Sequence, residues 1–212
     1  MRTLIYLLII SLFTTTVSAN SGRANAFDYY VLALSWSPNW CALEGDARRS
    51  PQCNNLRDHG WTLHGLWPQF HRGWPTYCQT KQRNPPRDLT ESMSDIMGTS
   101  GLAWYQWKKH GRCSGLSASS YFDLARRAYN NVTRPESFRQ LVTTVKLPAS
   151  IVEQAFLQAN PAIESNMLTV TCRNGHIQEV RICLSKELSP IHCGTDTIRD
   201  CTLRDALFNP IR

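Results

Sequence analysis

Two histidines lie in stretches rich in aromatic residues. His64 occurs in WTLHGLWP at 61–68, and His110 occurs in WYQWKKHGRC at 104–113. Imidazole titrates close to neutral pH, so a neutral and a protonated ring can together supply one general base and one general acid. Lys109 adds a fixed positive charge that can stabilise negative charge on phosphoryl oxygens. If the fold brings the two histidines together, the site suits cleavage of a phosphodiester.

The second stretch has the spacing of a helix that presents polar side chains on one side. On a helix, positions four apart share a face. Two adjoining pairs can then surround one small anion: Tyr105 with Lys109, and Gln106 with His110. Helical tryptophans most often pack in a core. We therefore expect Trp104 and Trp107 to anchor this helix.

The N-terminus has the outline of a signal peptide. A basic residue precedes an apolar run over 4–13, a small and polar stretch follows, and Val17-Ser18-Ala19 forms a cleavage site. The apolar run is shorter than the roughly 20 residues that a spanning helix needs. We predict cleavage after Ala19, with a second candidate site as late as Ala26, and no membrane association of the mature protein. Residues 20–212 fit a single domain.

Eight cysteines follow the export signal. An even number of cysteines in an oxidising compartment favours disulfides. Zinc is the competing interpretation, but no CxxC pair occurs, and the only close cysteine and histidine are His192 and Cys193. We expect disulfides and no metal site.

The chain is basic, with a formal charge of +7 and a pI near 9.1. Such a charge attracts a phosphate-rich partner at long range, and it attracts an anionic membrane surface as well. Charge alone does not choose between them.

Strand-like segments occur at both ends of the mature sequence. Residues 27–36 and 60–67 are aromatic and β-branched, with Pro68 expected to end the second, while 168–173 and 176–185 flank Asn174-Gly175, which is typical of a type I′ hairpin turn. Capping residues and prolines predict helices between these segments, over 88–97, 102–110, 121–132, 135–142 and 150–158. This order predicts an α+β fold with a central antiparallel sheet flanked by helices.

WTLHGLWP at 61–68 and WKKHGRC at 107–113 resemble the two active-site motifs of the ribonuclease T2 family. The resemblance continues through LALSWSPNWC at 32–41, the cysteine spacing and the C-terminal hairpin, so it covers nearly all of the mature chain. It implies a secreted or periplasmic, monomeric endoribonuclease that needs no cofactor. The expected reaction on single-stranded RNA gives 2′,3′-cyclic phosphates and then 3′-phosphates. DNA lacks the 2′-hydroxyl and should not be cleaved.

The resemblance also implies roles for individual residues. His64 would be the general acid on the departing 5′ oxygen, and His110 the general base on the ribose 2′-hydroxyl. Lys109 would stabilise charge on the phosphoryl oxygens, and Trp67 would lie beside the phosphate and the first base. Trp74 stands where relatives offer an aromatic ring for base stacking. It is equally open to being a loop aromatic that packs on its own disulfide.

This sequence departs from the family pattern at several site positions. Tyr105-Gln106-Trp107 replaces the usual His-Glu-Trp. We keep Gln106 in the catalytic set, since its amide can hydrogen-bond a phosphoryl oxygen but cannot carry charge or a proton. Without that carboxylate we expect a less acidic pH optimum than in relatives that have it. Tyr105 and Ser35 are assigned to substrate binding. Ser35 and Gln69 replace a common glutamine and aspartate, which leaves base preference open.

The cysteine pairs that the resemblance implies are Cys41–Cys53, Cys78–Cys113, Cys172–Cys201 and Cys183–Cys193; spacing alone does not fix the connectivity. Two other functions stay open. The changes at Tyr105 and Gln106 would suit an RNA-binding or signalling protein that kept the fold and lost turnover. A metal-dependent hydrolase is the other alternative, although no cluster of histidines and carboxylates has ligand spacing.

Overall fold

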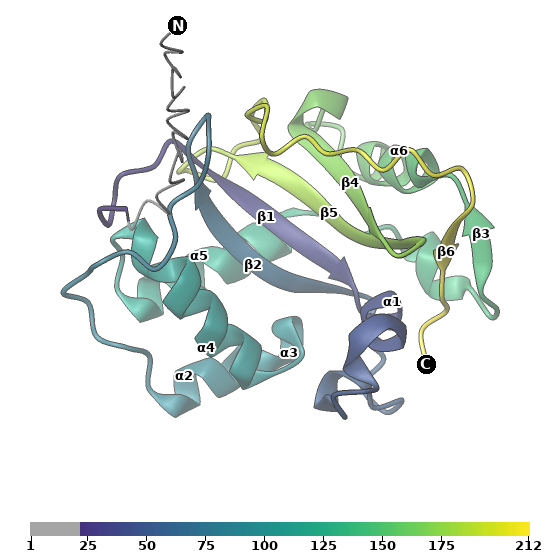
Figure 1. Cartoon of the computed structure of the whole chain (residues 1–212), viewed down its shortest axis with the longest axis horizontal. Coiled ribbons are helices and arrows are strands. Elements are labelled where there is room, and N and C mark those ends of the chain that lie inside the picture. The colour runs from purple at the N-terminus through teal and green to yellow at the C-terminus, as the bar shows by residue number, and fades with distance from the viewer. Residues whose placement is uncertain (1–21) are drawn as a thin grey trace, which may run out of the picture.

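The computed structural model describes residues 22–212, so the predicted signal peptide lies outside the described residues (Figure 1). A six-stranded sheet forms the centre, in the order β2-β1-β5-β6-β3, with β4 also paired to β5. The strands are β1 (Tyr29–Trp36), β2 (Trp61–Gln69), β3 (Val145–Leu147), β4 (Leu168–Arg173), β5 (His176–Leu184) and β6 (Ala206–Phe208). The α+β prediction is confirmed. The pairs are antiparallel except for one short parallel contact between β5 and β6, which makes the sheet mixed.

Helices flank the sheet at three places. In Figure 1, α2, α3, α4 and α5 gather beside β1 and β2, α1 follows the end of β1, and α6 lies along β4. The helices are α1 (Ser37–Trp40), α2 (Arg87–Ser92), α3 (Ser94–Met97), α4 (Ser100–Lys109), α5 (Ala118–Asn131) and α6 (Ala149–Ala159). Short turns of other helix types are a π-helical turn over Cys41–Gly45 and 3-10 turns over Pro51–Cys53, Gly111–Ser114, Glu136–Gln140 and Ser165–Met167. Within the described part of the chain, no helix is long and apolar enough to cross a membrane.

Several predicted boundaries are wrong for identifiable reasons. Strand β2 continues through Pro68 to Gln69, because β2 is an edge strand and a proline there costs no ladder hydrogen bond. The helix expected over 135–142 is only a 3-10 turn in which Phe138 alone is buried. The helix expected over 88–97 divides into two, α2 and α3.

Helix α4 carries the second motif and has a defined start. The Thr99 hydroxyl accepts a hydrogen bond from the backbone N–H of Leu102 at 3.1 Å, which satisfies one free donor of the first turn. Trp107 is fully buried, as predicted, but Trp104 is 37% exposed. Trp104 shares a helix face with exposed Lys108, and that face points away from the core. The predicted core role of Trp104 is therefore wrong.

The predicted hairpin turn is confirmed. Asn174 and Gly175 have φ values of 48° and 77° between β4 and β5, the left-handed conformation that a type I′ turn requires at both central residues. A turn of this type continues the strand twist. It therefore helps to fix the register that places the β5 side chains.

All eight cysteines form disulfides, and the pairs coincide with those that the resemblance implies: Cys41–Cys53, Cys78–Cys113, Cys172–Cys201 and Cys183–Cys193. The second of these ties the loop after β2 to the turn that follows α4. The two stretches that contain the histidines are thus covalently linked close to where they meet.

Candidate active site

His64 lies at a bulge in β2. Ala33 of β1 pairs with Gly65, and the next residue, Leu34, pairs with Leu63, so His64 is the extra residue on its strand. A bulge bends the strand and re-aims a side chain out of the regular alternation. The bulge lets both His64 and Gly65 face away from the core, although they are adjacent in sequence.

Gly65 makes room for the contact between the two motifs. A Cβ atom at this position would lie 2.3 Å from Oε1 of Gln106 and 2.3 Å from Nε1 of Trp67. These two atoms instead meet each other, since the Trp67 indole N–H donates to Gln106 Oε1 at 2.8 Å. Any larger residue at position 65 would push the first motif away from α4.

Trp67 lies between the two histidines. The His110 ring stacks on the indole, with centroids 5.2 Å apart and planes at 26°, while the His64 ring meets it edge-on at 5.1 Å. The fold therefore brings together the two histidines that the sequence singled out.

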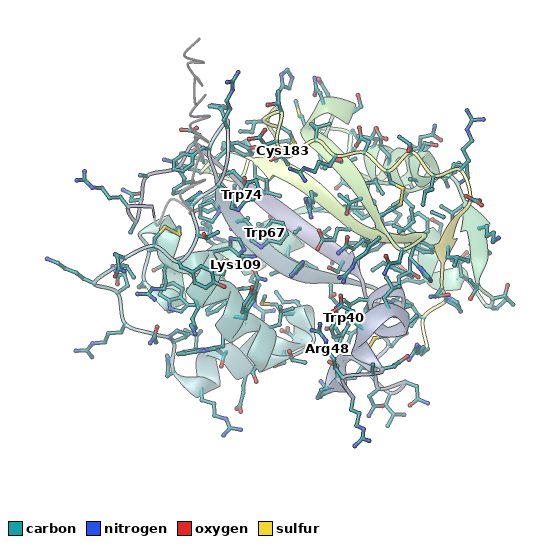
Figure 2. The ribbon with its side chains drawn as sticks, in the orientation of Figure 1. Trp40, Arg48, Trp67, Trp74, Lys109 and Cys183 are labelled. Atoms are coloured by element: carbon teal, nitrogen blue, oxygen red, sulfur yellow. A yellow bond between two sulfur atoms is a disulfide. The ribbon has the colours of Figure 1, made fainter. Side chains whose placement is uncertain are left out.

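The predicted helical stripe lines one cavity of about 340 Å³ with both histidines; the lining includes His64, Trp67, Trp74, Tyr105, Gln106, Lys109 and His110. Figure 2 shows Trp67, Trp74 and Lys109 gathered near the C-terminal part of α4 and strand β2. The Trp74 side chain is about half exposed, and Lys109 Nζ lies 5.8 Å from the centroid of the Tyr105 ring. This combination of aromatic faces and positive charge suits a nucleotide phosphate with its base.

His110 is held in its neutral form. Only 5% of the residue is exposed, and burial, together with the charges of Lys109 and His64, lowers its pKa from 6.5 to about 3. Its Nδ1 is buried with no hydrogen-bond partner among the described residues. A neutral imidazole at physiological pH can accept a proton, as a general base must.

His64 has a carboxylate partner that sequence reasoning missed. Nδ1 of His64 contacts Oε1 of Glu179, a residue that is 1% exposed, and Arg181 Nη2 lies 2.7 Å from the other carboxylate oxygen. Burial alone would raise the pKa of Glu179, but the charges and hydrogen bonds of His64 and Arg181 lower it to about 2. A buried ionised carboxylate can accept the Nδ1–H of the imidazole beside it and so fixes the orientation of that ring.

A sequence signal for this partner exists in β5. Glu179 and Arg181 carry opposite charges two positions apart, so they share one face of a strand that is otherwise largely apolar. The Arg181 guanidinium also lies over the Trp67 ring, 5.3 Å from its centroid. Charged residues in a buried strand need partners, and here the partners are site residues.

Ser35 does not line the cavity that contains His110. Its hydroxyl donates to Glu179 Oε1 at 3.4 Å, and it lines a second cavity that also contains His64 and Tyr105. Gln69, the other position that leaves base preference open, lines the first cavity. Among residues 22–212, no group of three or more histidine, cysteine or acidic side chains is placed to hold a metal ion.

The fold and the site have features that suit cleavage of a phosphodiester. A disulfide-stapled α+β fold brings a neutral imidazole, an imidazole with a buried carboxylate, and a lysine around one cavity with aromatic walls. Residues 27–193 match the model of the Ribonuclease T2 family, and the chain belongs to this family. It is a ribonuclease of the T2 type, and RNA is the substrate that this membership implies.

Relatives in sequence and in structure agree with this assignment. A ribonuclease from Aeromonas hydrophila is 35% identical over 199 residues, which cover 92% of this chain and 86% of that protein. An RNase-related protein from Calystegia sepium has a similar structure, with a TM-score of 0.65 at 21% identity over 86% of this chain and 98% of its own. RNase NT, solved with 5′-AMP, gives a TM-score of 0.64 at 20% identity over 87% and 98%. At these identities the structural likeness supports the fold alone.

Proposed function

We propose that this protein is an exported, monomeric endoribonuclease that cleaves single-stranded RNA by transphosphorylation with two histidines and without a metal ion. The observation that carries the proposal is the unequal pair of histidines around Trp67. His110 is buried and neutral, whereas His64 is paired with ionised Glu179. One ring is thus prepared to take a proton and the other to give one.

The first step follows from these states. His110 removes the proton of the ribose 2′-hydroxyl, and the oxygen attacks the adjacent phosphorus. His64 donates a proton to the departing 5′ oxygen as the P–O bond breaks, which leaves a 2′,3′-cyclic phosphate and a 5′-hydroxyl. In a second step water opens the ring with the two roles exchanged and gives a 3′-phosphate. DNA has no 2′-hydroxyl and would not react.

The remaining cavity residues would bind and stabilise charge. Lys109 would hold the phosphoryl oxygens as they gain negative charge, and the Gln106 amide N–H would donate to one of them. The bound phosphate also brings negative charge close to His110, which raises its pKa and makes it a stronger base. Trp67, Trp74 and Tyr105 offer ring faces on which any base can stack, at about 1–3 kcal/mol per base.

Export is supported by the disulfides, which form in oxidising compartments. Of the two candidate cleavage sites, the earlier one, after Ala19, fits better. Arg23 pairs with Gln79 as a β-bridge, and the backbone N–H of Asn25 donates to Cys113 at 2.9 Å. Cleavage after Ala26 would remove both contacts from the folded protein.

The proposal is tested with purified mature protein and RNA in excess chelator. We expect cleavage by the parent and a loss of about 10²–10⁴-fold in both His64→Ala and His110→Ala, the range of a single proton transfer. His192→Ala is the matched control, since the His192 side chain is 68% exposed and does not line the cavity. Binding without cleavage by the parent would favour the non-catalytic alternative, and cleavage abolished by chelator would favour a metal-dependent hydrolase.

A further inference from the structure

A second cavity adjoins the active site and is more than twice as large. Its volume is about 790 Å³, against about 340 Å³ for the cavity that contains both histidines. It lies between the segment that follows β1, the start of α4, and the β4–β5 hairpin. Ser35, His64 and Tyr105 line its inner end, and Trp40, Arg48, Arg49 and Arg173 line its outer end.

The lining indicates which part of an RNA strand this cavity faces. His64 lines both cavities, whereas His110 lines only the smaller one. In the proposed function, which this inference deepens, His64 protonates the departing 5′ oxygen. The larger cavity therefore receives the strand that leaves, on the 3′ side of the cleaved bond. The larger cavity extends from His64 to Arg48, Arg49 and Arg173, so there is room for the chain to continue.

The outer end carries an excess of positive charge. Glu44 pairs with both Arg48, at 2.5 Å, and Arg173 of the hairpin, while Arg49 also lines the cavity. The carboxylate is largely covered, at 16% exposed, but the Arg48 and Arg173 side chains are 67% and 50% exposed. Three guanidinium groups against one carboxylate leave a net charge of about +2. Guanidinium groups bind phosphate through paired N–H donors.

The backbone of the segment that holds Arg48 and Arg49 is constrained at several points. Cys41–Cys53 closes it, and a π-helical turn over Cys41–Gly45 interrupts regular helix within it. A Cβ atom at Gly45 would lie 2.6 Å from the Trp40 ring, so the glycine lets the indole pack directly on the backbone. Arg49 has a φ of 51°, a conformation that a non-glycine residue keeps only when its surroundings impose it. Groups held in place in this way lose little entropy on binding.

We propose that Arg48, Arg49 and Arg173 form a further subsite, which binds a phosphate of the RNA strand beyond the nucleotide that leaves, with Trp40 as an aromatic wall. Figure 2 shows Trp40 and Arg48 as a group apart from Trp67, Trp74 and Lys109. The subsite makes the enzyme favour longer strands over dinucleotides. It acts on the 3′ side of the cleaved bond only.

The test compares three RNA substrates that share one cleavable linkage: a dinucleotide, the same linkage with three nucleotides added on the 3′ side, and the linkage with three added on the 5′ side. We expect kcat/KM to rise most with the 3′ extension. The variant with Arg48→Gln and Arg49→Gln should lose about tenfold on the 3′-extended substrate and less than twofold on the dinucleotide. The slope of log kcat/KM against log salt should fall by about 0.7 for each phosphate contact removed.

The matched control removes two other exposed arginines, Arg83→Gln with Arg127→Gln, which lowers the net charge equally. Equal losses in the two double variants, equal losses on all substrates, or no loss would overturn the subsite. Binding of a 2′-deoxy oligonucleotide with the same 3′ extension, followed by fluorescence anisotropy, separates this inference from the proposed function. If the parent cleaves no RNA, the proposed function is refuted. Weaker binding of this oligonucleotide by the variant with Arg48→Gln and Arg49→Gln than by the parent would still support the subsite, and equal binding would refute it.

Discussion

Replacing Glu179 by glutamine removes the charge that joins β5 to His64 while keeping the shape of the side chain. The pKa of Glu179 falls from 4.5 to about 2 in the folded protein. At 1.36 kcal/mol per pKa unit, the ionised form gains about 3 kcal/mol from the fold. Glu179→Gln should therefore lower the free energy of unfolding by about 3 kcal/mol at pH 6, and it leaves Arg181 without its partner.

The sign of the pH dependence follows from the lowered pKa. A carboxylate whose pKa is lower in the folded than in the unfolded protein stabilises the fold. For Glu179 this contribution is fully present above the unfolded-state pKa of 4.5, and it is lost as the pH falls toward 2. The difference between parent and Glu179→Gln should shrink from about 3 kcal/mol at pH 6 to about 1 kcal/mol at pH 3. Urea unfolding at the two pH values measures it, with exposed Glu187→Gln as the control. An equal difference at both pH values would refute the reasoning.

Activity gives a second readout for the same variant, because Glu179 positions His64 and does not touch the substrate. We expect kcat to fall by about 10²-fold, the lower limit for loss of a general acid. KM should stay near that of the parent, since Glu179 contacts His64 and not the substrate. A variant that was merely less stable would keep the parent kcat under conditions in which it stays folded.

Two further predictions concern α4 and the strand that faces it. Gln106→Glu should move the acid limb of the pH–rate profile to higher pH. A carboxylate near His110 raises the pKa of that histidine above about 3, so the neutral base becomes protonated at a higher pH. An unchanged acid limb would contradict this. This direction is opposite to the expectation from the sequence, which was a less acidic pH optimum without the carboxylate. Without a carboxylate at position 106 the pKa of His110 is lower, so the base stays neutral at more acidic pH. Gly65→Ala should cost about 1–3 kcal/mol of stability and lower kcat/KM, because its Cβ collides with Gln106 and Trp67; thermal unfolding and kinetics that match the parent would disprove it.

Local sequence features predicted much of the fold. The Asn174-Gly175 turn needs only two residues in the left-handed conformation, α5 needs its Ser117 cap and an apolar face, and α6 needs an apolar face. A short window of the chain therefore contains the information for each. The helix predicted over 135–142 did not form, because too few of its side chains are buried. Within Glu136–Gln140 only Phe138 is buried, and a single turn with one anchor does not continue as an α-helix.

The site was predictable only in part. His64, His110 and Lys109 stand in compact motifs, and the sequence identified them. Glu179 lies 115 residues from His64, and the pair depends on the sheet register and on the bulge that turns His64 toward β5. No local pattern contains that register. The grouping of Arg48 and Arg49 with Arg173 depends on the fold in the same way, since Arg173 reaches Glu44 across 129 residues.

Product analysis tests the central claim most directly. A short RNA with one cleavable linkage is incubated with the enzyme in water enriched in ¹⁸O, and the products are followed by mass spectrometry. We predict a 2′,3′-cyclic phosphate without ¹⁸O as the first product, followed by a 3′-phosphate that carries one ¹⁸O. A linear phosphate that contains ¹⁸O from the earliest times, with no cyclic intermediate, would contradict the two-histidine transphosphorylation.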